Sequence, residues 1–157
     1  DACLGAMGVV HGPIDLEMIR DIDENNASAN ECFSHAGAIK IAGIDGKVAD
    51  MKNQLLLNYK NGDEKARLAI DTLVMTVAME IAGLDVVCAN DIEGIVLTGS
   101  IGSATEPFDF KDKINMYFKN SYPLKVISSE SGAIGAAQIA MDVYNGKKEI
   151  LGIEVEI

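Results

Sequence analysis

The chain has 157 residues, and its 13 basic and 24 acidic side chains give a formal net charge of −11. Its apolar fraction of 48% and charged fraction of 24% are close to the averages of globular domains, which excludes a disordered tail and a fibrous repeat. The acidic excess disfavours nucleic acids and membrane surfaces as partners, because both are bound through clustered lysine and arginine. No apolar run is long enough to span a membrane.

The cysteines and the first residue indicate the setting of the chain. Cys3, Cys32 and Cys88 are odd in number and far apart, so the sequence predicts neither a disulfide framework nor a zinc site. A reducing cytoplasm is the simplest compartment for such a chain. The chain opens at Asp1 without an initiator methionine, and we expect residues 1–157 to be a single domain cut from a longer two-domain protein.

Helices dominate the prediction for the first half of the chain. Ser28 and Glu31 form the Ser-x-x-Glu pattern of a capping box, in which the serine oxygen accepts a backbone N–H and the glutamate reaches back to the cap. This pattern predicts a helix over residues 29–41, before Gly43. Two shorter helices are expected, one from near Asp15 and one over residues 47–59.

A longer helix is predicted over residues 63–82. Its apolar residues recur at spacings of three and four, with Asp63 as the expected cap and Gly83 as the expected stop. The helix carries so much apolar surface that we expect it to be the most buried helix of the protein.

The second half of the chain alternates strands and helices. Short apolar strands are predicted over residues 95–97 and 124–127, and the alternating tail predicts a half-exposed strand over residues 150–157. Helices are predicted over residues 109–118 and 131–144. This alternation favours an α/β domain with a twisted, mixed or mostly parallel sheet of about five strands that is covered by helices.

The stretch that follows the strand over 95–97 is the first candidate site. Thr98, Gly99, Ser100 and Gly102 come at the carboxyl end of a predicted strand, where ligands gather in open α/β sheets. Small residues let a ligand approach the backbone, and glycine N–H groups can receive phosphate oxygens. A tight turn with no ligand is the competing interpretation.

The start of the alanine-rich helix over 131–144 is the second candidate. Glu130 and Gly132 lie where the first helical turn leaves N–H groups free for an anion. The alternative is a close helix contact made by small residues. If the strands over 95–97 and 124–127 are adjacent and parallel, the two candidate turns lie side by side at one edge of the sheet.

Two further residues are candidate catalytic groups. His11 lies in a loop rich in glycine and proline, where it acts as an acid–base group or as a simple turn residue. Arg20 forms either a bidentate phosphate contact or a surface ion pair with Asp21 or Asp23. The acidic cluster over residues 21–24 is interpreted as a solvated turn and not as a metal site.

Three segments of the chain resemble the C-terminal domain of acetate and butyrate kinases. These kinases belong to the ASKHA superfamily of acetate and sugar kinases, Hsc70 and actin, which has an actin-like, ribonuclease H-like fold. Residues 94–102 resemble the family's adenosine motif, residues 1–13 resemble the stretch that leads to its Gly-Pro sequence, and residues 131–137 resemble its C-terminal alanine-rich helix. Among the relatives of these kinases, the chain is most similar to an archaeal methanogenesis marker protein family, the twelfth of its series.

The resemblance implies that this chain is the nucleotide-side half of a kinase. The intact protein would transfer the γ-phosphoryl of ATP to a carboxylate or similar acceptor with Mg²⁺, while the missing N-terminal domain closes the cleft. Thr98, Gly99, Ser100 and Gly102 would contact the nucleoside, Glu130 and Gly132 would shape the far wall, and His11 would face the phosphoryl group. The alternative is a non-catalytic module that senses nucleotides or assists assembly.

We also expect a homodimer. The helices are rich in apolar residues for a chain without its partner domain, and the resembling kinases pair through this domain. The candidate contact surfaces are residues 55–57 and 74–81.

Overall fold

The computed structural model describes residues 7–12, 16–89 and 91–155. The expectations that concern Cys3, Asp15 and the last two residues of the tail lie outside these ranges. The described chain is mostly helical, and its elements in order are α1 (Leu16–Asp23), α2 (Ala29–Ser34), α3 (Gly37–Ala42), α4 (Val48–Lys60), α5 (Glu64–Val87), β1 (Ile95–Leu97), α6 (Gly99–Gly102), α7 (Phe110–Phe118), β2 (Leu124–Val126), α8 (Ser131–Tyr144), β3 (Glu149–Ile150) and β4 (Ile153–Glu154).

The strands form two small sheets, so the predicted ASKHA sheet of about five strands is wrong. β1 pairs with β2 in parallel, and β3 pairs with β4 in an antiparallel hairpin. Within the described residues no third strand joins β1 and β2. The physical reason is that these strands are only two or three residues long, while most apolar residues of the chain recur at helical spacing and are placed in helices.

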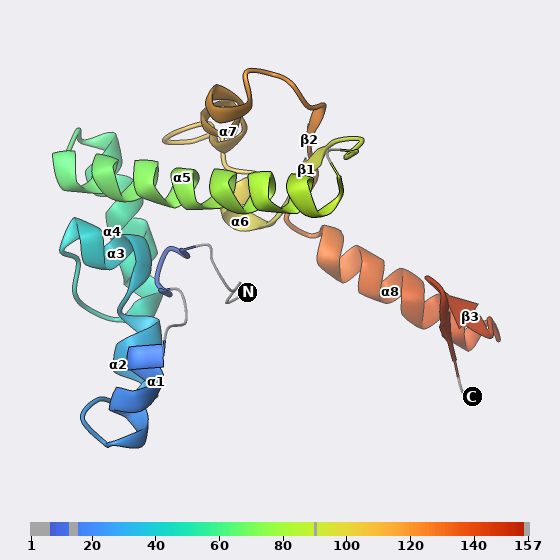
Figure 1. The fold of residues 1–157 in the computed structure, drawn as a ribbon, viewed down its shortest axis with the longest axis horizontal. Coiled ribbons are helices and arrows are strands. Elements are labelled where there is room, and N and C mark those ends of the chain that lie inside the picture. Colours follow the sequence, from blue (N-terminus) through green and yellow to red (C-terminus); the bar gives the residue numbers. More distant parts are fainter. Residues whose placement is uncertain (1–6, 13–15, 90, 156–157) are drawn as a thin grey trace.

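The core is built around α5. Figure 1 shows α5 running across the body, with α3 and α4 on one side and α7 on the other. Asp63 caps the helix as predicted, because its carboxylate accepts the N–H of Ala66 at 2.8 Å. The stripe Ala66, Ala69, Ile70, Leu73, Val74 and Ala78 is buried.

The prediction for the end of α5 is wrong. The helix continues past Gly83 to Val87, and the apolar residues of its last turn are exposed, with Leu84 at 60% and Val87 at 81% of full exposure. α5 supplies more buried residues than any other described helix, as expected, although a larger fraction of the short α3 is buried.

The predicted helix over residues 29–41 is two helices. The capping box of Ser28 and Glu31 is present at the start of α2, but the chain breaks before α3 at Gly37, where φ is +67°. The N–H groups of Ala38 and Ile39 donate to the carbonyls of Gly8 and Val9. The loop over residues 8–11 therefore occupies the start of α3, which prevents α2 and α3 from forming one continuous helix.

Gly37 is required for this contact. A Cβ at position 37 would lie 2.4 Å from the carbonyl oxygen of Gly8 and 2.5 Å from that of His11. The positive φ also disfavours an L side chain. The loop over residues 8–11 is thus held against α3 by backbone atoms on both sides.

Asp85 is a buried charged residue near the end of α5. The residue is only 8% exposed, and one of its carboxylate oxygens accepts a hydrogen bond from the Tyr122 hydroxyl at 2.5 Å. This hydrogen bond, together with burial and the negative charge of Asp85, raises the pKa of Tyr122. The contact ties the chain just before β2 to α5.

Tyr122→Phe should lower the melting temperature at pH 7 by a few degrees, because it leaves the buried carboxylate without its donor. The pKa of Tyr122 is raised in the folded state. The stability that its hydrogen bond contributes is therefore fully present below about pH 10, the pKa of an unfolded tyrosine, and is lost as the pH rises through the raised value. The difference from wild type should therefore be constant near neutrality and shrink in strong alkali. Tyr117→Phe, on the half-exposed Tyr117, is the control; equal melting of Tyr122→Phe and wild type at pH 7 would contradict the role of the contact.

Candidate functional site

Two strand–turn–helix units lie side by side. β1 leads into α6 and β2 leads into α8, and the parallel register pairs Ile95 with Leu124 and Leu97 with Val126. The ladder continues one step further, because the N–H of Ile127 donates to the carbonyl of Leu97 at 3.0 Å. The expected adjacency of the two candidate turns is confirmed.

Thr98 joins the two turns. Its hydroxyl donates to the carbonyl of Ser128 at 3.0 Å. The same carbonyl accepts the backbone N–H and the hydroxyl of Ser131, at 3.0 and 2.5 Å. One oxygen atom therefore connects the end of β1 with the start of α8.

The turn over residues 98–102 forms the short helix α6. Gly99 has φ of +78°, which favours glycine, although open space surrounds its Cβ position. A Cβ at Gly102 would make only ordinary contact with Leu97, at 3.6 Å. The Ser100 hydroxyl accepts a hydrogen bond from the ammonium of Lys52, on α4, at 2.7 Å. The conformation of the turn therefore depends on the positive φ of Gly99, and the Lys52 ammonium links the turn to α4.

A pocket of about 370 Å³ lies against this turn. Its walls come from five parts of the chain: the segment before α1, α5, β1 with the turn that follows it, α6 and α7. They consist of Met7, Gly8, Val9, Leu73, Val77, Val96, Leu97, Thr98, Ile101, Gly102 and Phe110. Apart from the Thr98 hydroxyl these side chains are apolar or absent, so the pocket suits a flat or apolar group with few polar atoms.

The loop that carries Gly8 and Val9 is fixed from behind. Backbone hydrogen bonds join Gly8 to His11 and the loop to residues 36–39, and the N–H of Met7 donates to the hydroxyl of Thr76, on α5, at 3.2 Å. This wall of the pocket is consequently attached both to α3 and to α5.

Glu130 and Gly132 lie next to the turn over residues 98–102 but do not line the pocket. Both residues are exposed at the start of α8. The N–H of Glu130 donates to the Ser128 hydroxyl at 3.1 Å. Of the six predicted nucleotide-binding residues, the structure therefore brings only Thr98 and Gly102 to the pocket wall, whereas Gly99, Ser100, Glu130 and Gly132 lie outside its lining.

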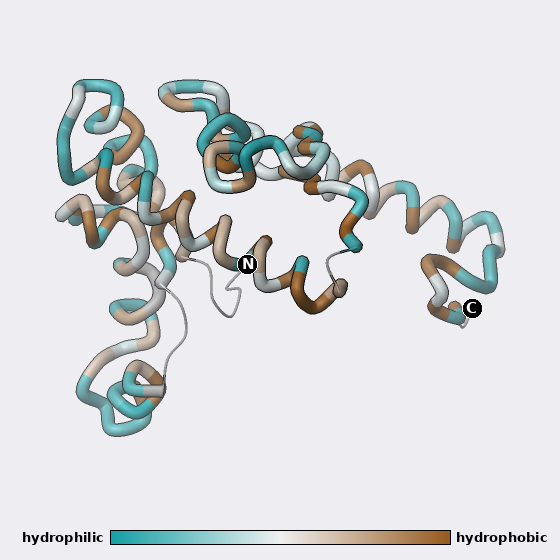
Figure 2. Tube along the Cα trace, turned by 45° about the horizontal axis from the view of Figure 1, so that its top comes forward, coloured by the Kyte–Doolittle hydropathy of each residue, from teal (hydrophilic) through white to brown (hydrophobic). Residues whose placement is uncertain are grey.

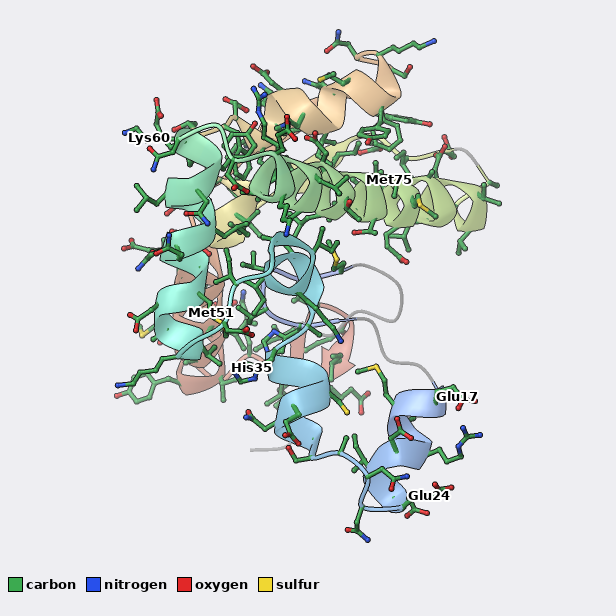
Figure 3. All side chains as sticks on the ribbon, turned by 90° about the vertical axis from the view of Figure 1, so that its left-hand side faces the viewer. Glu17, Glu24, His35, Met51, Lys60 and Met75 are labelled. Carbon is green, nitrogen blue, oxygen red and sulfur yellow. The ribbon has the colours of Figure 1, made fainter. Side chains whose placement is uncertain are left out.

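His11 and Arg20 are not part of this site. His11 is exposed, and its carbonyl accepts the N–H of Gly8, as in the turn interpretation. Arg20 forms a surface ion pair with Glu17 and a second one with Glu24 at 3.9 Å, instead of with Asp21 or Asp23. Figure 3 shows Glu17, on α1, and Glu24, just after this helix, well away from α5.

The described residues contain no group of three His, Cys, Asp or Glu side chains that could hold a metal ion. The acidic cluster over residues 21–24 is not the predicted turn, because residues 21–23 form the last turn of α1 and only Glu24 follows the helix. Cys32 and Cys88 are free thiols. No helix of the described ranges is both long and apolar enough to cross a membrane.

No local pattern in the sequence indicates Lys52 or the apolar walls from residues 7–9 and α7, because their places depend on contacts between distant segments. A second polar contact was also missed: Lys113, on α7, donates to Asp71, on α5, at 2.7 Å. Burial lowers the pKa of Lys113, but the hydrogen bond and charge of Asp71, with a contribution from Tyr59, outweigh burial and raise the pKa. This pair fastens α7, which carries one wall of the pocket, to α5.

Thr98→Val should loosen the connection between the two turns without changing the shape of the residue. We expect the free energy of unfolding to fall by about 0.5–1.5 kcal/mol, the usual contribution of one hydrogen bond. Urea denaturation measures this change, with Thr105→Val, at an exposed threonine, as the matched control. Equal losses in the two variants would show that the contact with Ser128 contributes nothing.

No protein-family model matches the chain. The chain is 55% identical over 157 residues to a UPF0285 protein of Methanothermobacter thermautotrophicus, with all of this chain and 47% of the relative covered. It is 49% identical to a UPF0285 protein of Methanocaldococcus jannaschii, covering 99% of this chain and 47% of the relative. It is 51% identical to one of Methanococcus aeolicus, covering 100% and 46%.

The chain therefore spans about half the length of these relatives. The expected relation to an archaeal family of methanogens is confirmed, whereas the comparisons give no support to the kinase resemblance. The chain is homologous to the UPF0285 proteins of methanogenic archaea.

Proposed function

We propose that the pocket beside residues 98–102 binds the nucleoside part of ATP, and that the full-length protein transfers its γ-phosphoryl to a carboxylate or similar acceptor. The observation that carries this proposal is the apolar pocket at the carboxyl end of β1, which lies next to a parallel strand and is lined on one side by a turn rich in glycine. Ligands of α/β units bind at such strand ends. The proposal does not depend on an ASKHA sheet.

The composition of the pocket supports a base and sugar more than phosphates. Its walls offer apolar contact and the single hydroxyl of Thr98. Positive charge comes from Lys52, whose ammonium lies 2.7 Å from the hydroxyl of Ser100. In this proposal the nucleoside enters the pocket, and the phosphates extend along the turn toward Lys52. Mg²⁺ would be bound by the phosphates and by residues beyond this chain, where it offsets phosphate charge.

Val96→Phe tests the pocket directly. Val96 lines the pocket and is 58% exposed, so a larger side chain fills the space without disturbing the core. We expect the affinity of the full-length protein for adenosine and ATP to fall at least about tenfold, or 1.4 kcal/mol, with little change in melting temperature. Calorimetric titration measures both ligands.

Val126→Phe is the matched control, because Val126 is a partly exposed valine of the neighbouring strand that does not line the pocket. Unchanged ATP and adenosine affinity in Val96→Phe would refute binding at this pocket. Gly99→Val is a poor substitute, since its positive φ would strain any valine.

Lys52→Gln separates phosphate binding from nucleoside binding. Loss of the ammonium beside Ser100 should weaken ATP several-fold and leave adenosine affinity unchanged, because only the nucleotide carries phosphate charge. The same titrations on Lys65→Gln, an exposed lysine at the start of α5, provide the control. If ATP and adenosine weaken equally, or neither weakens, Lys52 has no role toward phosphate.

A second candidate function is a non-catalytic module that senses a nucleotide or assists assembly. The exposed apolar residues Leu68, Met75 and Met79 of α5 favour it, because exposed apolar surface is typical of interfaces. The two candidates differ in turnover: a phosphotransferase forms ADP from ATP in the presence of a carboxylate acceptor, and a sensor binds ATP without turnover.

The homodimer expected from the sequence is also kept as a proposal. Of its two candidate surfaces, Leu55, Val74 and Ala78 belong to the core, whereas Leu57 and Met79 are 51% and 65% exposed. Only the exposed members are available to a second copy. Light scattering of the full-length protein at high micromolar concentration distinguishes a dimer from a monomer.

A further inference from the structure

α8 has almost no contact with the rest of the described chain. Figure 1 shows it extending from the body, with the hairpin of β3 and β4 at its far end. No residue of α8 is buried, and Ile134, Met141 and Tyr144 are 62%, 54% and 86% exposed. Figure 2 shows hydrophobic residues recurring along this helix.

The composition of α8 is typical of a helix that is buried in a protein interior. Its one charged residue, Asp142, is paired with Lys147 at 2.8 Å. Ser131, Gln138 and Asp142 are spaced by seven and four, so the polar side chains share a single narrow stripe. A helix that is apolar on most of its circumference is normally buried.

The face opposite this stripe consists mostly of alanine side chains. We call it the alanine face; its members recur at spacings of three and four and are Ala133, Ala136, Ala137, Ala140, Val143 and Tyr144. Small side chains allow the backbone of another element to approach closely. A solitary helix of this length is also only marginally stable in water, so α8 needs a packing partner.

The relatives indicate what this partner is. Their match to this chain includes α8, and they contain about as many residues again beyond the match. A second copy is a poor occupant for the alanine face alone, because a helix of 14 residues offers a face of about 21 Å by 10 Å. Stable association of separate proteins needs about 800 Å² from each partner, whereas a segment on the same chain docks at a high effective concentration.

We propose that the alanine face of α8 docks on the other half of the full-length protein, the residues that the relatives have beyond the matched region. The interface joins two parts of one polypeptide, and the hairpin of β3 and β4 lies at its outer end. This inference rests on the exposure and composition of α8, and it does not depend on nucleotide binding.

Hydrogen exchange of the full-length wild-type protein tests the docking without any substitution. The amides of residues 135–144 should exchange at least about 100-fold more slowly than those of an unstructured chain, because a packed helix opens rarely. Exchange within about tenfold of the unstructured rate would overturn the proposal, since a helix left in water frays continually.

Neighbouring substitutions in the full-length protein locate the buried face. Ala137→Glu places a carboxylate in the alanine face, whereas Gln138→Glu places it in the polar stripe one residue away, and the two variants differ little in helix propensity. Ala137→Glu should reduce the protection of α8 at least tenfold while the protection of α5 is retained, and Gln138→Glu should leave both unchanged. Equal effects of the two substitutions would overturn the proposal.

A photo-crosslinking residue identifies the occupant, and it remains informative if Ala137→Glu does not fold. p-Benzoylphenylalanine is placed at position 137 of the full-length protein, and the products are mapped by mass spectrometry. Crosslinks within one chain to residues beyond the matched 157 are expected. A product of twice the chain mass, which indicates a second copy, or links confined to residues 1–157 would overturn the proposal.

Discussion

The packing of α5 against α3, α4 and α7 determines where the rest of the body lies. Its buried stripe combines small alanines with Ile70, Leu73 and Val74, and the small side chains let neighbouring helices approach closely. Leu73 belongs at once to this core and to the pocket wall. The candidate site is therefore positioned by the same helix that organises the hydrophobic interior.

The pocket exists because segments distant in sequence converge at one strand end. β1 and β2 bring two turns together, the Thr98 hydroxyl connects them through Ser128, and Gly8 and Val9 add a further wall. Lys52 reaches the same turn from α4. Backbone hydrogen bonds and helix packing hold the segments that line the pocket. The position of its walls is therefore determined by the fold.

Local signals in the sequence were sufficient for most elements. The capping residues Ser28 and Asp63 begin the predicted helices, and the short strand Ile95–Leu97 has the predicted bounds. The break before α3 escaped prediction because it depends on carbonyls some thirty residues earlier in the chain. The five-stranded sheet failed for a related reason: an apolar tripeptide indicates a strand but does not indicate its neighbours. In the site, the glycine-rich turn was recognisable from its own residues, whereas His11 and Arg20 were chosen by residue type and lie elsewhere.

The docking of the loop over residues 8–11 also bears on how freely its sequence can vary. The atoms that bind α3 are main-chain carbonyls, which every amino acid possesses, and the partial positive charge at the start of the helix attracts them whatever side chains follow. The steric requirement lies on α3 instead, because a side chain at position 37 would clash with these carbonyls. A change of side chain at Val9 would therefore alter the lining of the pocket while the main-chain contacts that hold the loop on α3 remain available.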